Sequence, residues 1–211
     1  MNIGDHQTIE KNGVLLNLSD IEKDCWQELM KGCMQTRHPF HQPAFASSNN
    51  CSPEIRTVVL RKVVPTQKQL YFHTDCRSRK YNEIKNFPQV SCLFYDFNAR
   101  LQIRVNAIAS LHCDDGDADE AWKMTGLNSR KTYMIAQAPS TISHIPTSGL
   151  EEKFISKDPS QEESEAGRKN FCLIKCLVKS IDWLWLNSKG HKRAVFTYEN
   201  TDLADANWII P

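Results

Sequence analysis

Apolar residues recur along this chain at two spacings, one typical of helices and one typical of strands. Across residues 19–30 they return every three or four positions, which predicts an amphipathic helix, and Ser19 and Glu22 have the spacing of a capping box. Residues 55–64 are instead dense in β-branched side chains, which predicts a strand. Residues 69–74 predict a second strand that returns beside the first, so we expect a hairpin.

More strands of this kind follow, separated by turns and short helices. Further strands are predicted at residues 89–95, 101–111, 171–185 and 193–198. Helices are predicted at residues 78–86, 117–124 and 128–138. Repeated antiparallel strands with a few flanking helices predict a mainly β, α+β fold built as a barrel.

The remaining segments bear on domain organisation. Residues 140–170 are poor in large apolar side chains and rich in Ser, Glu and Pro, so we expect a mobile insertion within a single domain that spans residues 1–211. No stretch approaches the roughly 18 uninterrupted apolar residues of a membrane span. Residues 1–12 lack a basic region followed by an apolar run. We therefore expect a cytoplasmic protein without a membrane segment.

The cysteines and histidines do not have the spacing of a metal site. The eight cysteines are scattered without the short paired spacings of a zinc site, so we expect reduced packing residues and no bound metal. An acidic run, residues 114–119, follows His112 and could attract a cation, but it is more typical of the start of a helix.

The net charge of +1 hides an uneven distribution of basic residues. Residues 56–104 hold ten Lys or Arg residues against three Asp or Glu residues. Within them, residues 74–80 leave a predicted strand and enter a predicted helix with Arg79 and Lys80 in its first turn. Cations there oppose the helix dipole unless an anion lies between them and the free N–H groups. The pattern predicts a phosphate site; a solvated basic turn is the alternative.

A second polar feature lies on the predicted strand at residues 101–111. Gln102 and Arg104 alternate with apolar neighbours, so both side chains point to the same face of the strand. An amide side chain both donates and accepts hydrogen bonds, which suits the mixed edge of a heterocycle. A solvent-facing strand surface is the alternative.

In order, these motifs resemble the pyridoxamine 5′-phosphate oxidase family. They are Arg56-Thr-Val-Val-Leu-Arg61, Tyr71-Phe-His-Thr74, Ser78-Arg-Lys80, Gln102 and a closing Trp-x-x-Pro. The likeness runs from about Arg56 to Val105, resumes near Ile181, and is greatest to the family's less characterised FMN-binding branch. It implies a split β-barrel of antiparallel strands with flanking helices, and a homodimer that holds FMN in a cleft at the subunit interface.

The resemblance also assigns roles to residues. It implies that the FMN phosphate is held by Arg56, Arg79 and Lys80 with Thr74 beside them, and that Gln102 contacts the isoalloxazine ring. The implied cofactor-binding set is Arg56, Thr57, Val58, Arg61, His73, Thr74, Ser78, Arg79, Lys80, Gln102 and Arg193. The implied substrate residues are Arg61, Ser129 and His191, and the candidates for catalytic roles are His191 and Arg193.

One region departs from the family pattern. The oxidase proper binds its substrate's phosphate with a tyrosine, an arginine and a serine from a segment that reads Trp122-Lys-Met-Thr-Gly-Leu-Asn-Ser-Arg130 here. Ser129 is the candidate for the serine, Trp122 stands near the tyrosine, and the arginine is missing, with Lys123 and Arg130 as candidates to compensate. The departure puts activity on pyridoxamine phosphate in doubt and leaves FMN binding unaffected.

The function implied is that of an FMN-dependent oxidoreductase, in which a small unassigned substrate transfers a hydride to FMN and oxygen reoxidises the cofactor. One alternative is a non-catalytic protein that retains flavin or haem. Another is a β-barrel that binds single-stranded nucleic acid. The second alternative is less favoured, because the basic residues gather at one turn rather than along an extended groove.

Overall fold

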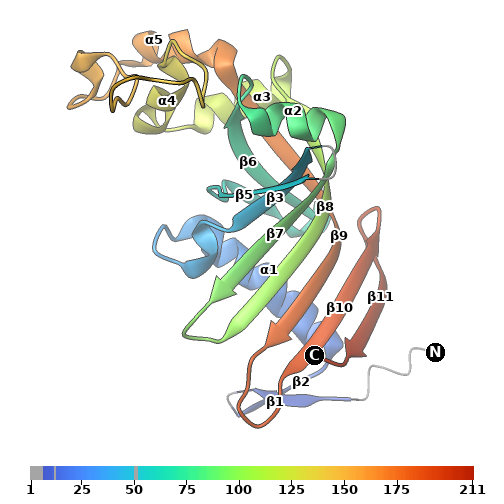
Figure 1. The fold of residues 1–211 in the computed structure, drawn as a ribbon. Coiled ribbons are helices and arrows are strands. Elements are labelled where there is room, and N and C mark those ends of the chain that lie inside the picture. Colours follow the sequence, from blue (N-terminus) through green and yellow to red (C-terminus); the bar gives the residue numbers. More distant parts are fainter. Residues whose placement is uncertain (1–6, 12, 50–51) are drawn as a thin grey trace.

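The computed structural model describes residues 7–11, 13–49 and 52–211. Nine of the described strands form one antiparallel sheet that curves around a long helix (Figure 1). Its strands are β3 (Ala44–Asn49), β4 (Ser52–Thr57), β5 (Lys62–Val64), β6 (Gln69–Asp75), β7 (Gln89–Asp96), β8 (Leu101–His112), β9 (Phe171–Trp185), β10 (Lys192–Glu199) and β11 (Asp202–Ile209). A small separate sheet pairs β1 (Ile9–Lys11) with β2 (Val14–Leu16).

The long strand β9 organises the sheet. The main strand order is β11-β10-β9-β8-β7-β3-β4, and β6 also pairs with β9 and carries β5. One edge of β9 pairs with β8 along most of its length. The other edge pairs with β6 over its first half and with β10 over its second half. β9 therefore connects both ends of the molecule.

The helix α1 (Leu18–Met34) fills the concave side of the sheet. Its Ile21, Cys25 and Leu29 side chains are fully buried in the main core, as the apolar spacing predicts. The predicted cap is wrong, because Asn17 caps the helix and forms the capping box with Asp20.

The other helices gather at one end of the sheet (Figure 1). They are α2 (Arg79–Asn86), α3 (Gly116–Met124), α4 (Leu127–Met134) and α5 (Gln161–Ser164), and short 3-10 turns lie at Pro39–His41, Pro65–Gln67, Glu152–Phe154 and Glu165–Asn170. Residues 140–151 form no helix or strand, whereas Phe154 and Ser164 are buried. The later part of the segment predicted to be mobile therefore packs against the fold.

The strand predicted at residues 55–64 is interrupted. Val58 and Leu60 turn inward and are buried, and their N–H groups donate to the carbonyls of Pro43 and His41 rather than to a neighbouring strand. The segment therefore divides into β4 and β5. The predicted hairpin is confirmed by the pairing of β5 with β6.

The other predicted strands and helices are present with shifts of a few residues at their ends. β1, β2, β3 and α5 were not predicted, and neither was the last strand, β11. That strand lies at the sheet edge and is mostly exposed, so its residues lack the alternation of a half-buried strand. Among the described residues, no helix is long and apolar enough to cross a membrane. The mainly β, α+β prediction is confirmed.

Candidate functional site

The turn between β6 and α2 places polar groups at the start of a helix. Ser78 caps α2, with its hydroxyl accepting from the Tyr81 N–H, and it lies 3.0 Å from the Thr74 hydroxyl. Arg77 turns away from this point, because its guanidinium donates to the Asp75 carboxylate. Of the cations at residues 77–80, only Lys80 lines the same cavity as Thr74 and Ser78.

A cavity of about 840 Å³ lies beside this turn, and we call it the Lys80 cavity. One side is formed by His73, Thr74, Asp75, Ser78 and Lys80, and the other side by residues from the segment 132–150. Lys80 makes no ion pair with any residue that the structure describes. Burial lowers the pKa of Lys80 to about 8, and the nearby charge of Arg56 adds to this effect. An anion in the cavity would offset both costs.

The other two cations of the predicted phosphate site lie elsewhere. Arg56 on β4 donates to the buried Glu83 carboxylate at 2.9 Å and also contacts the Ser47 hydroxyl. Arg79 is exposed and borders a different hollow of about 280 Å³ that includes Glu54 and Glu83. Thr74, Ser78 and Lys80 thus line the same cavity, whereas Arg56 and Arg79 do not, although Arg56 lies close enough for its charge to lower the pKa of Lys80. Thr57 is exposed and Val58 is buried in the core.

A second cavity, of about 450 Å³, lies on the other side of His73, and we call it the Arg61 cavity. His73 borders both cavities, and its buried Nδ1 has no hydrogen-bond partner among the described residues. Burial, together with the nearby charge of Arg61, lowers the pKa of His73 to about 3. The ring is therefore neutral at pH 7. A buried ring nitrogen without a partner is a group that a ligand could satisfy.

The opposite side of the Arg61 cavity is a face of α3, which sequence reasoning did not find. Asp117, Glu120, Ala121 and Met124 line it. Their spacing along the helix places them on one face, and this could have been predicted. That this face meets Arg61 depends on how α3 packs against β9, which no local pattern reveals.

Gln102 and Arg193 lie near the other end of the sheet. Gln102 on β8 and Arg193 on β10 both pair with Leu184 on β9, so they share one row. Arg193 donates to both Asp182 carboxylate oxygens at 2.9 and 2.7 Å. His191 lies in the loop before β10, where its Nδ1 accepts from the Asn187 N–H. None of these residues borders either cavity.

The segment at residues 122–130 does not form a phosphate site. Arg130 is 1% exposed, and its guanidinium donates to Ser164, to Glu165 and to backbone carbonyls, so the idea that it compensates for the missing arginine is wrong. Trp122 is buried and donates to Glu165. Ser129 lines neither cavity, and Lys123 is exposed.

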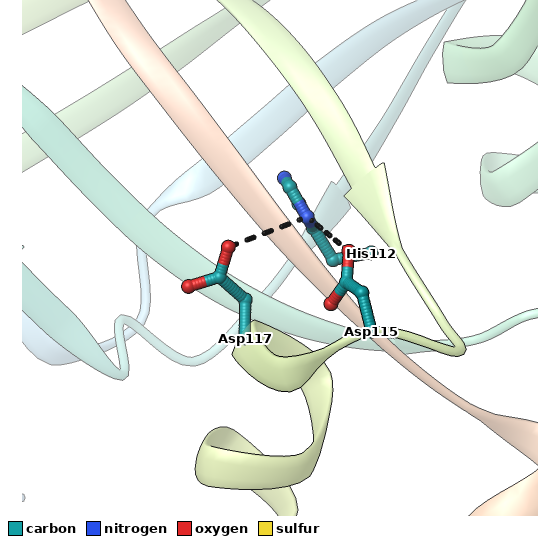
Figure 2. Close-up of side chains that lie close together, drawn as sticks. All are labelled: His112, Asp115 and Asp117. Carbon is teal, nitrogen blue, oxygen red and sulfur yellow. Dashed lines mark hydrogen bonds and ion pairs between the residues drawn. The ribbon is translucent and has the colours of Figure 1, made fainter.

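The acidic run after His112 starts α3, as the sequence predicts. His112 Nδ1 lies 2.7 Å from Asp115 and 3.7 Å from Asp117 (Figure 2). Asp115 caps α3 by accepting from the Ala118 N–H, and Asp117 forms an ion pair with Lys175 at 2.6 Å. The two carboxylates next to His112 therefore already have partners within the protein.

Comparison with known proteins links this geometry to a family. Residues 23–112 match the model of the pyridoxamine 5′-phosphate oxidase FMN-binding domain. Over these residues the chain is similar to that family. It is 23% identical over 194 residues to pyridoxine/pyridoxamine 5′-phosphate oxidase 2 of Arabidopsis thaliana, covering 87% of this chain and 93% of the relative. It is 24% identical over 209 residues to pyridoxine/pyridoxamine 5′-phosphate oxidase of Pelagibacter ubique, covering 95% and 96%.

Two solved structures share the fold. A pyridoxamine 5′-phosphate oxidase-related, FMN binding protein from Nostoc punctiforme superposes with a TM-score of 0.72 at 22% identity, covering 93% of this chain and 100% of that chain. PhzG from Burkholderia lata, solved with tetrahydrophenazine-1-carboxylic acid, gives 0.66 at 14% identity, covering 90% and 92%. The split-barrel fold implied by the sequence resemblance is confirmed.

Proposed function

We propose that this chain is an FMN-dependent oxidoreductase that acts as a homodimer on a small substrate. The observation that carries the proposal is Lys80, a half-buried ammonium that borders a cavity at the start of α2 and has no ion-pair partner in the described part of the chain. An unpaired buried charge is unfavourable, and a phosphate in this cavity would stabilise it. The matched FMN-binding domain supports FMN as the source of that phosphate.

Thr74, Ser78 and Lys80 would hold the phosphate, and the free N–H groups at the start of α2 favour the same charge. Arg56 contributes indirectly in this arrangement. It pairs with Glu83, which would otherwise be an unpaired carboxylate close to the phosphate. Arg79 faces away from the Lys80 cavity, so we expect it to contribute less than Lys80.

The positions of Gln102 and Arg193 support a site shared by two copies of the chain. Thr74 pairs with Cys172, whereas Gln102 pairs with Leu184, twelve residues further along β9. At about 3.3 Å per residue, this is a strand path of roughly 40 Å. FMN is much shorter than this path. We therefore propose that Gln102 and Arg193 reach the cofactor held by the Lys80 cavity of a second copy.

FMN, when bound, would supply the acceptor for a hydride from the substrate, and oxygen is the proposed final acceptor. The Arg61 guanidinium would stabilise negative charge that develops beside it during reduction. His73, neutral at pH 7, can form one additional hydrogen bond through Nδ1. The protein would thus orient the cofactor and favour its reduced form.

The test begins with the absorbance spectrum of the purified protein, which we expect to be that of a flavin. Lys80→Met should lose at least tenfold in FMN affinity, because it removes a charge-assisted hydrogen bond. Lys85→Met, on the exposed face of the same helix, should keep full affinity. Equal affinities in the two variants would contradict the assignment of the phosphate.

Turnover and assembly need separate measurements. Amines and other reduced substrates are added to the flavin-loaded protein without oxygen, and we expect the flavin spectrum to bleach and to recover in air. A flavin that no candidate bleaches would indicate a binding protein, and a haem spectrum or a colourless protein that binds oligonucleotides would overturn the proposal. Dilution to monomer should release FMN, and a monomer that retains it would contradict the shared site.

A further inference from the structure

The Arg61 cavity has charges of opposite sign on facing sides. Arg61 and Lys62 come from the start of β5, and Glu120 comes from α3. Within the described residues, none of these three side chains forms an ion pair. Asp117 also lines the cavity, but Lys175 neutralises it at 2.6 Å. The cavity therefore offers cations on one side and one free carboxylate on the other.

Apolar and aromatic side chains also line the cavity. Tyr71, Ala121, Met124 and Leu173 contribute them, and the ammonium of Lys62 lies 5.4 Å from the centre of the Tyr71 ring. A volume of about 450 Å³ lies within the range of small-molecule sites. An apolar body with an opposite charge at each end would match this lining.

We propose that the Arg61 cavity binds a small amino acid-like zwitterion, with its carboxylate toward Arg61 and Lys62 and its ammonium toward Glu120. The binding of the zwitterion does not depend on the proposed function. Only the idea that this ligand is the substrate of the oxidoreductase rests on it. A carboxylate beside Arg61 and Lys62 forms charge-assisted hydrogen bonds, and so does an ammonium beside Glu120. A ligand with one charge leaves one side of the cavity without a partner.

The chain's own groups argue against a phosphorylated ligand at the α3 side. Arg130, the nearest arginine in sequence to this face, is buried and fully used by Trp122, Thr125, Ser164 and Glu165. Glu120 and Asp117 would repel a phosphate that entered from α3. We therefore expect the amine end of the ligand to face this side.

The test compares three probes that share a phenyl ring and a short chain. L-Phenylalanine carries both charges, phenethylamine lacks the carboxylate, and hydrocinnamate lacks the ammonium. Affinities are measured by calorimetry at pH 7 on the flavin-loaded protein. Because the three charged side chains are exposed to solvent, which weakens each charge pair, we expect L-phenylalanine to bind only about five- to tenfold more tightly than either analogue.

Two variants assign the charges to the two sides. Glu120→Gln should weaken L-phenylalanine and phenethylamine about fivefold and leave hydrocinnamate unchanged. Lys62→Met should weaken L-phenylalanine and hydrocinnamate and leave phenethylamine unchanged. Glu162→Gln is the matched control, because Glu162 is exposed and lines neither cavity, and it should change none of the affinities.

The outcomes separate this inference from the proposed function. Weak or equal binding of all three probes, or a Glu120→Gln effect that does not depend on the ammonium, would overturn the zwitterion site. The FMN content is measured on every sample. A protein that lacks FMN but follows the expected probe pattern would contradict the proposed function alone, and one that binds FMN but fails the pattern would contradict this inference alone.

Discussion

Replacing Arg130 by Met tests how the helices beside the Arg61 cavity are held together. The guanidinium is 1% exposed and lies 4.4 Å from the centre of the Trp122 ring. It donates at 2.7 to 3.0 Å to the carbonyls of Trp122 and Thr125, the hydroxyl of Ser164 and the carboxylate of Glu165. One side chain therefore joins α3 and α4 to the turn at residues 164–170.

The variant removes every donor but keeps a long apolar side chain against Trp122. Breaking a buried charge pair costs about 3–5 kcal/mol. Glu165 is half exposed and can regain water, whereas the two carbonyls and the hydroxyl cannot do so without movement. We therefore expect a loss of about 3 kcal/mol in the free energy of unfolding, near the lower end of that range.

The measurement is urea unfolding followed by tryptophan fluorescence and by far-UV circular dichroism, since coincident curves justify a two-state free energy. Arg168→Met is the matched control, because Arg168 also contacts a carboxylate, Asp119, but does so at the surface. The ion pair between Arg168 and Asp119 should contribute no more than about 1 kcal/mol to the free energy of unfolding. If Arg130→Met costs no more than Arg168→Met, the buried network does not hold these helices.

Three further changes have expected outcomes of different kinds. FMN affinity should fall as pH rises through about 8, where the Lys80 ammonium loses its proton, and Lys80→Arg should remove this dependence in a titration of bound flavin. Gly32→Ala would place a Cβ 2.6 Å from the Phe40 Cβ and should cost about 1–3 kcal/mol in thermal unfolding, whereas Gly116→Ala meets open space and should be tolerated. Burial alone would raise the pKa of Asp182, but hydrogen bonds from two arginines hold it below its usual value. Its stabilising effect is therefore complete above the usual carboxyl pKa of about 3.9 and is lost as pH falls below it, so Asp182→Asn should be less stable than the parent at pH 7 and equal to it in strong acid.

Local sequence patterns predicted most helices and strands of this fold, but they did not predict where a strand is interrupted. The alternation in β8 and the apolar spacing in α1 both follow from burial on one face, which a sequence displays directly. The break between β4 and β5 arises because the N–H groups of Val58 and Leu60 bond to a distant loop. No signal near those two residues reveals that partner.

In the candidate site, too, local sequence patterns identified some residues, whereas contacts between distant segments could not be predicted. The basic first turn of α2 identified Lys80 from the sequence, because the helix dipole makes such a turn unusual. Arg56 is paired with Glu83 because α2 packs against the sheet, and the sequence did not reveal that Arg56 lies outside the cavity that Lys80 borders. Glu120 was missed because its importance comes from the side chains across the cavity.

The double pairing of β9 affects how the molecule can open. Since β6 and β10 share one edge of this strand and β8 covers the other, β9 cannot be released until its neighbours separate. Its backbone amides should therefore exchange with deuterium only through global unfolding, later than those of the edge strand β11. The helical end and the β10–β11 end thus form one cooperative unit, and damage at either end lowers the stability of the other.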